Sequence, residues 1–209
     1  MKIISVENLV FPEINIIRFG RFQDERGYFS EPFRQSDFKT NQLLKPIFEN
    51  IDFVQMNESY SLSNVIRGLH FQWQPAQGKL IRTIYGRMID LILDIRQNSP
   101  NYGKIIAYDM PECKTNDYSE WIWIPFGFAH GNIFTEETRI EYYCSGEYNP
   151  KCEAGICPLS NEIDWSLCDE KLRNIYVSLK EQFLISEKDR NGLSLSDWKN
   201  DERANYFVM

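Results

Sequence analysis

The chain has 209 residues and a formal net charge of −7 at pH 7, with 43% hydrophobic and 25% charged residues. These values are ordinary for a globular protein and exclude collagen, coiled coil and low-complexity disorder. The acidic balance argues against nucleic acid or an anionic membrane as a partner, so we expect neither. The length predicts one domain over residues 1–209, and the 14% aromatic content favours β structure.

The sequence also argues against a membrane span and a secreted, disulfide-linked protein. No segment reaches the roughly 20 apolar residues that cross a bilayer, and Glu7 and Asn8 interrupt any signal-peptide core near the N-terminus. The five cysteines are odd in number and none forms a Cys-x-x-Cys pair, which disfavours a zinc knuckle or a disulfide framework. We therefore expect reduced thiols and a cytoplasmic protein.

The first fifty residues predict short extended segments and one helix. Extended runs at 14–19 and 28–33 flank a turn signal at 23–27. A helix is predicted over 36–44, capped at its first residues and ended by Pro46.

Short strands separated by turn residues dominate the middle of the chain. Their spacing of roughly 8–12 residues is typical of a sandwich or barrel. The expected strands are 53–59, 65–73, 79–85, 87–96, 104–109, 120–124, 130–134 and 139–144. The sequence thus predicts an all-β dominated barrel over about 15–150. A helical and irregular segment follows over about 151–209, with helix-friendly residues at 167–181 and a polar tail with aromatic anchors at 193–209.

The strand at 87–96 carries two carboxylates on one face. A period of two places Asp90 and Asp94 together, opposite a face of Leu and Ile side chains. Carboxylates are unusual in a packed core. That face is therefore expected either to meet solvent or to line a polar cavity.

The first of the two histidines lies in a cluster of basic residues. A strand histidine is more often a core or surface residue, but Arg67 and Lys79 accompany His70 in an acidic chain, which suits an anionic ligand beside a proton-transfer group. Arg67 and His70 are three residues apart, so strict alternation would place them on opposite faces. Both can line one cavity only if the strand is irregular at Gly68, and we predict a bulge there.

The second histidine belongs to the spacing Pro125-x-Gly127-x-x-His130, which is half of the cupin double motif. The other half would begin at His70, but Gln72 stands where a second metal-binding histidine is expected. Two histidines cannot supply the usual ligands of three His and one Glu. The sequence therefore predicts a cupin-like, jelly-roll β-barrel without a metal or other cofactor.

Taken together, these segments resemble the dTDP-4-dehydrorhamnose 3,5-epimerase family, nucleotide-sugar epimerases with a metal-free cupin barrel. The resemblance covers about residues 10 to 190. The motifs that carry it are R-G-L-H-x-Q at 67–72, Q-G-K-L at 77–80 and G-F-A-H-G at 127–131, with supporting matches at 24–31, 53–59 and 90–100.

The resemblance implies catalytic roles for four residues. His70 would be the general base, paired with Asp189 of a Ser-x-Lys-Asp motif. Lys79 would stabilise the enolate oxygen, and Tyr143, thirteen residues after His130, would be the acid on the opposite face. The alternative roles are structural: Tyr143 in the core, Asp189 at a helix end, and Lys79 in solvent.

The resemblance also implies substrate-binding residues. Those that would line the pocket of their own chain are Gln55, Asn57, Arg67, His130 and Tyr148. Those that would reach into the site of a neighbouring subunit, in a homodimer with exchanged N-terminal strands, are Arg26, Phe29 and Glu31.

The implied activity is inversion of C3 and C5 of a nucleotide-linked 4-keto-6-deoxyhexose, dTDP most naturally, through an enolate, as in deoxysugar biosynthesis. A C–H beside a ketone is a weak acid, so a base, a cation for the oxyanion and an opposed acid suffice. The sequence departs from the family at Met56, Glu58 and Asn132, where Asp, His and Phe are usual. The alternatives are a C3-only or C5-only epimerase on a dTDP, GDP or CDP sugar, a 3,4-ketoisomerase, and a binding module without activity.

Overall fold

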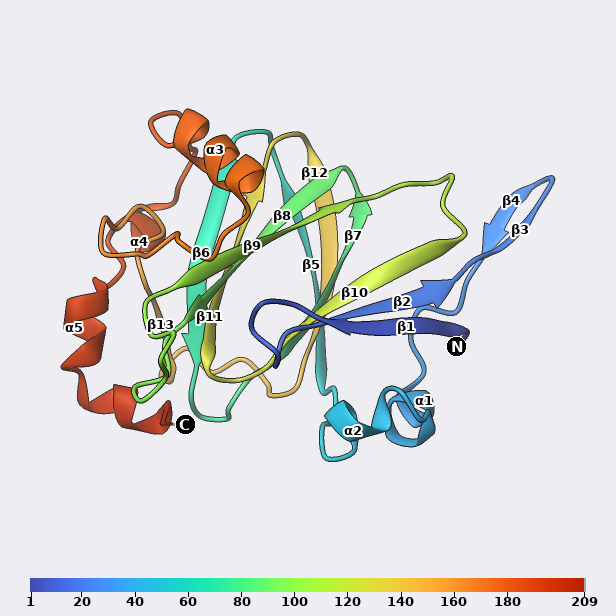
Figure 1. Ribbon diagram of the computed structural model, residues 1–209, viewed down its shortest axis with the longest axis horizontal. Helices are drawn as coiled ribbons and strands as arrows, with labels where there is room; N and C mark the ends of the chain where they lie inside the picture. The colour runs from blue at the N-terminus through green and yellow to red at the C-terminus, as the bar shows by residue number, and fades with distance from the viewer. Residues whose placement is uncertain (209) are drawn as a thin grey trace.

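Two antiparallel sheets face each other in the computed structural model, which describes residues 1–208 (Figure 1). The six-stranded sheet has the order β1-β2-β10-β7-β12-β5, and the five-stranded sheet has the order β13-β6-β11-β8-β9. The strands of the first sheet are β1 (Ile3–Asn8), β2 (Asn15–Gly20), β5 (Gln55–Ser61), β7 (Lys79–Tyr85), β10 (Tyr118–Ile124) and β12 (Thr138–Cys144). Those of the second are β6 (Val65–Gln72), β8 (Arg87–Asp94), β9 (Ile105–Pro111), β11 (Phe128–Phe134) and β13 (Glu153–Gly155).

The remaining elements lie outside the two sheets. A hairpin of β3 (Phe22–Asp24) and β4 (Gly27–Phe29) projects from the body of the molecule (Figure 1). The helices are α1 (Gln35–Thr40), α2 (Lys45–Phe48), α3 (Glu170–Leu179), α4 (Glu187–Arg190), α5 (Leu195–Lys199) and a 3₁₀ helix (Glu202–Tyr206). This arrangement confirms the predicted all-β class, with a few short helices.

Three apolar clusters explain why strands of both sheets carry hydrophobic residues on both faces. The cluster between the sheets joins side chains such as Ile81 and Ile122 to Ile92 and Phe128. The outer face of the six-stranded sheet packs against α1 and α2, and the outer face of the five-stranded sheet packs against the C-terminal segment. Burial of apolar surface on both faces is the main force that holds these layers together.

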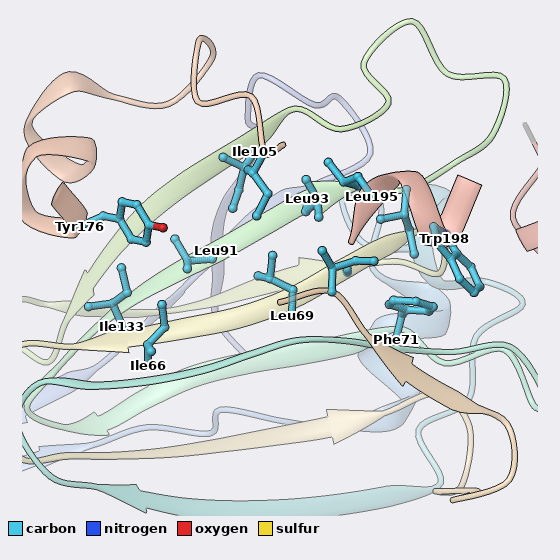
Figure 2. Packing of buried hydrophobic residues seen from close by; sticks show 14 of the residues in the cluster. Ile66, Leu69, Phe71, Leu91, Leu93, Ile105, Ile133, Tyr176, Leu195 and Trp198 are labelled. Carbon is cyan, nitrogen blue, oxygen red and sulfur yellow. The ribbon is translucent and has the colours of Figure 1, made fainter. Parts of the chain in front are cut away.

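The C-terminal segment is a covering layer rather than a polar tail. Trp198 and Phe207 are buried and pack on Phe71 of β6, and Figure 2 shows Leu69, Leu91, Trp198 and Phe71 in the same cluster. The predicted aromatic anchors are therefore present. The last residue of the predicted tail, 209, lies outside the described residues.

The acidic face of β8 was expected either to meet solvent or to line a polar cavity. Asp90 and Asp94 are fully buried between the sheets, so the solvent-facing alternative is wrong. Asp94 is held by Arg96 at 2.7 Å and by Ser99 at 2.6 Å. The opposite face of β8 is apolar because the C-terminal segment covers it.

The predicted helix at 36–44 ends early. The structure has α1 over Gln35–Thr40, with no side-chain cap, and a second helix that begins at Lys45 with Pro46 in its first turn. Proline suits a first turn because its missing N–H would have no partner there. Pro46 therefore starts a helix instead of ending one. Within residues 1–208, no helix combines the length and apolar character that crossing a bilayer requires.

Candidate active site

A cavity of about 310 Å³ lies between the two sheets and receives side chains from both. The five-stranded sheet contributes His70 and His130, and the six-stranded sheet contributes Lys79 and Tyr142. Asp189 of α4 lines the same cavity. A second hollow of about 380 Å³ shares His70, Lys79 and Tyr142 with it, so the two spaces form one continuous site.

His70 and Asp189 form the predicted pair. The Nε2 atom of His70 lies 2.7 Å from Oδ1 of Asp189, and the backbone N–H of Gly68 donates to the other carboxylate oxygen at 3.2 Å. The hydroxyl of Ser186 caps α4 by accepting from the N–H of Asp189, which fixes the start of that helix. Burial raises the pKa of Asp189, but the hydrogen bonds outweigh it and the pKa is lowered. Asp189 therefore remains a carboxylate that orients the imidazole.

The predicted irregularity at Gly68 is confirmed. Its φ is +105°, and the register of β6 and β11 shifts between His130 and Asn132. A Cβ atom at this position would stand 2.6 Å from the Cα of Gly131, so only glycine fits. The shift lets both Arg67 and His70 line the cavity, although they are three residues apart.

Lys79 is the cation that the six-stranded sheet contributes to the cavity, which Arg67 and Lys188 also line. It lies on β7 directly opposite Cys144 of β12. Burial lowers the pKa of Lys79, while Cys144, Asp90 and Glu153 act in the opposite direction. Among residues 1–208 its ammonium has no hydrogen bond or ion pair at contact distance, so its charge is available to a ligand.

The tyrosine that lines the cavity is Tyr142, which contradicts the predicted placement of Tyr143. Tyr142 lies in both hollows, and burial raises the pKa of its phenol. Tyr143 points to the outer face of the sheet, where its ring stacks on Phe33 at 4.3 Å and packs near Trp121.

The error came from counting residues along the chain instead of following the strand. A count of thirteen from His130 reaches the right residue only if the turn between β11 and β12 has the expected length. Alternation along β12, in contrast, decides directly which side chains face the cavity. On β12, Ile140 and Cys144 are buried with the inward face, and Arg139 and Glu141 share the outward face with Tyr143. That alternating pattern was visible in the sequence and would have selected Tyr142.

His130 belongs to a buried polar network. Its Nε2 atom lies 2.5 Å from Oδ1 of Asp90, and the amide of Asn132 donates to the same oxygen at 2.7 Å. Burial lowers the pKa of His130, against the opposing effect of Asp90. Asn132 lines the cavity, a position that the sequence identified only as a departure from the family pattern.

Gln55, Asn57 and Tyr148 meet at the mouth of the site, as predicted. The side chain of Gln55 donates to Asn57 at 3.0 Å and accepts from the backbone N–H of Tyr148 at 2.8 Å. The Tyr148 hydroxyl donates to Glu153 at 2.9 Å, and Lys188 forms an ion pair with the same carboxylate. Glu153 and Lys188 were not among the predicted residues.

Arg26, Phe29 and Glu31 do not reach the cavity of their own chain. Arg26 pairs with Asp24 at the tip of the projecting hairpin, and Phe29 is 69% exposed at its base, opposite Phe22. Glu31 accepts from Arg34 at 2.6 Å and from the N-terminal amino group at 2.9 Å. The structure therefore leaves the predicted intersubunit residues on the surface.

A separate cavity, also of about 310 Å³, is lined by charged residues of β2, β9 and β10. Its charges are paired with each other: Arg21 with Glu112 at 2.6 Å, and Arg18 with Glu120 at 3.3 Å. Within residues 1–208, no group of three or more His, Cys, Asp and Glu side chains is arranged to hold a metal ion. All five cysteines are free thiols.

Comparisons with known proteins agree with this geometry. A family model described as dTDP-4-dehydrorhamnose 3,5-epimerase matches residues 8–197. A protein of that name from Shigella flexneri is 34% identical over 210 residues, which cover all of both chains. Another from Escherichia coli is 39% identical over 169 residues, which cover 79% of this chain and 85% of the relative. A dTDP-6-deoxy-D-glucose-3,5-epimerase of Legionella pneumophila, solved in complex with dTDP-4-keto-L-rhamnose, is 31% identical, covers 92% of this chain and 93% of its own, and superposes with a TM-score of 0.75.

Proposed function

The chain belongs to the dTDP-4-dehydrorhamnose 3,5-epimerase family and is an epimerase, and we propose how its residues invert C3 and C5 of a dTDP-linked 4-keto-6-deoxyhexose. One observation carries the proposal. The pair of His70 and Asp189 lines the cavity from the side of the five-stranded sheet. Tyr142 and Lys79 line it from two neighbouring strands of the six-stranded sheet. Inversion needs proton removal from one face of a carbon and proton delivery to the other, and opposed sheets supply both groups.

His70 removes the proton. Its Nε2 atom is held by Asp189, which leaves Nδ1 as the nitrogen that takes the proton from the carbon beside the C4 ketone. The C–H electron pair moves into a C–C double bond, and the carbonyl electrons move to the oxygen. Lys79, a partly buried ammonium without a competing carboxylate at contact distance in residues 1–208, stabilises that enolate oxygen. Asp189 in turn stabilises the imidazolium.

Tyr142 returns a proton to the opposite face. Its hydroxyl gives the proton to the carbon as the enolate collapses to the ketone, and solvent then reprotonates the phenolate and deprotonates His70. Burial holds the pKa of Tyr142 above its ordinary value, so the phenol is protonated when it is needed. Tyr143 has no part in this step because it lies on the outer face of the sheet.

The mouth of the site binds the nucleotide end of the substrate. Arg67 is anchored to Ser61 and to the carbonyl of Tyr60, and its guanidinium suits a diphosphate oxygen. The half-exposed ring of Tyr148 suits stacking on a nucleotide base. Gln55 and Asn57 bind polar groups of the sugar and phosphates, and His130 lines the inner wall. The substrate already contains the ketone, so the reaction needs no cofactor, and free thiols agree with a cytoplasmic site of action.

Solvent exchange tests the activity directly. Incubated with dTDP-4-keto-6-deoxyglucose in heavy water, the protein is expected to place deuterium at C3 and C5 with inversion at both. Deuterium at one carbon alone would indicate a mono-epimerase, and migration of the carbonyl would indicate a ketoisomerase. Absence of exchange with dTDP, GDP and CDP sugars would leave a binding module and overturn the proposal.

The active assembly is a homodimer in which the β3–β4 hairpin reaches the cavity of the second subunit. Strands β1 and β2 pair within the chain, so the hairpin is the part of the N-terminal region that remains to make this contact. It exposes three aromatic rings, Phe22, Tyr28 and Phe29, which a monomer has no reason to hold in water.

Mixing two inactive variants tests this arrangement. His70→Asn lacks the base, and the double variant Arg26→Ala/Phe29→Ala lacks the hairpin contacts. A mixed dimer has one site with both parts intact, so random exchange should restore about a quarter of the wild-type activity. No recovery after verified subunit exchange would contradict the shared site.

A further inference from the structure

Asn132 has a role that its place in the family pattern does not explain. It is 5% exposed on β11, and its side-chain amide donates to Oδ1 of Asp90 at 2.7 Å. The same Oδ1 holds Nε2 of His130 at 2.5 Å. The second oxygen of Asp90 is buried and has no hydrogen-bond partner within residues 1–208. Two donors, His130 and Asn132, therefore share one oxygen of a buried carboxylate.

Asp90 acts on both of the basic groups that lie deepest in the cavity, His130 and Lys79. His130 is buried and Lys79 is partly buried, and the charge of Lys79 lowers the pKa of His130. Asp90 raises the pKa of both groups, and burial lowers it. The other titratable and charged groups that face them come from four elements. They are Arg67 and His70 on β6, Tyr142 and Cys144 on β12, Glu153 on β13, and Lys188 and Asp189 on α4.

We propose that Asn132 is a positioning residue: by donating to Asp90 it limits the pull of that carboxylate on a second proton, keeps His130 neutral and so leaves the positive charge of the cavity on Lys79. The inference rests on the proposed function, in which Lys79 stabilises the enolate. A hydrogen bond to a carboxylate disperses its negative charge, and its loss makes the remaining partner the favoured place for a proton. An apolar residue at 132 would therefore let His130 compete with Lys79.

The test removes the amide and observes His130 directly. The chain has two histidines, so nitrogen-15 NMR of the imidazole rings gives two sets of signals, and His70→Asn assigns them. In the wild type, His130 should remain a neutral Nε2–H tautomer at the pH where an ordinary imidazole gains its proton, because burial lowers its pKa. In Asn132→Leu it should begin to titrate near that pH, and its midpoint should rise by about one pH unit. Asn132→Ala repeats the test without the larger side chain.

Kinetics supply the second readout. In the same variants kcat should fall on the acid side as pH drops through the raised His130 midpoint, with KM within about twofold, because a charge on His130 opposes that of Lys79. The alkaline limb set by Lys79 should not move down, since His130 is neutral there. Asn15→Leu is the matched control, since Asn15 is equally buried but donates to Asn8 away from the cavity. It should change neither readout, even if it lowers stability.

Two results would overturn the proposal: an unchanged His130 titration in both Asn132 variants, or a pH profile that matches that of Asn15→Leu. The NMR measurement needs no substrate, so it stands even if the wild type proves inactive on every sugar nucleotide. Failure of the proposed reaction and failure of this inference are thus separate outcomes.

Discussion

Two cavities of about 310 Å³ in this protein are lined by charged side chains, yet they differ in how the charges are used. In the cavity beside β2, β9 and β10, the arginines are neutralised by glutamates at contact distance. In the cavity between the sheets, Lys79 has no carboxylate at contact distance within residues 1–208. Asp189, which lines that cavity, and Asp90, which lies behind His130, are each held by a histidine.

The difference separates a structural polar cluster from a chemical one. Buried ion pairs satisfy each other and leave nothing for a ligand, whereas an unpaired buried cation carries a desolvation cost that only a function accounts for. The size of a cavity did not distinguish the two. The predictions below change one group at a time to test which cavity performs the reaction.

The largest effect is expected from His70→Asn, which removes the base and keeps the volume of the side chain. Epimerisation should fall by about 10³-fold or more, with exchange of substrate hydrogen lost in parallel. Rates of deuterium incorporation measure it, and an unchanged circular dichroism spectrum serves as the control. Residual exchange within tenfold of the wild type would move the base elsewhere.

Lys79→Met should lower kcat by about 10²- to 10³-fold, because the enolate oxygen loses its cation. The pH profile gives a further check. Burial lowers the pKa of Lys79, so the ammonium is lost as pH rises through that lowered value, and activity should fall on the alkaline side well below the ordinary titration of lysine. Lys79→Arg keeps its charge at high pH and should extend the alkaline limb upward, even where kcat is reduced. An alkaline limb at the same pH in wild type and Lys79→Arg would show that another group sets it.

Tyr142→Phe and Tyr143→Phe are a matched pair on adjacent residues of one strand. Tyr142→Phe should reduce inversion by about 10²-fold while exchange with retention persists, since His70 still removes the proton. Tyr143→Phe should leave inversion within about threefold, because the hydroxyl lies outside the cavity. Product stereochemistry by NMR measures both, and a greater loss in Tyr143→Phe would restore the prediction made from residue counting.

Tyr142 and Tyr143 also illustrate which features of the site could be predicted from the sequence. Local spacing predicted the strands and the irregularity at Gly68, because each depends on neighbours along the chain. The contact of His70 with Asp189, 119 residues apart, became predictable only through the family resemblance.

The remaining errors have physical causes of the same kind. The residue count from His130 was given more weight than the alternation of β12, so Tyr143 was chosen instead of Tyr142. The polar tail predicted at 193–209 is instead a covering layer, because Trp198 and Phe207 pack on Phe71, more than a hundred residues earlier in the chain. The network of Asp90, His130 and Asn132 joins two strands whose register only the folded sheet determines.

The smallest effect on rate is expected in the other cavity, from Glu112→Gln. The side chains of Arg21 and Glu112 are 4% and 9% exposed, so this change leaves a buried guanidinium without its counter-charge. Stability should fall by about 1–3 kcal/mol because a buried ion pair is costly to break from one side. Urea unfolding measures that loss, while kcat/KM at a temperature where the variant is folded should stay within about twofold. A tenfold loss of kcat/KM with unchanged stability would mean that the paired cavity takes part in the reaction, and that an unpaired cation is not what distinguishes the catalytic cavity from the structural one.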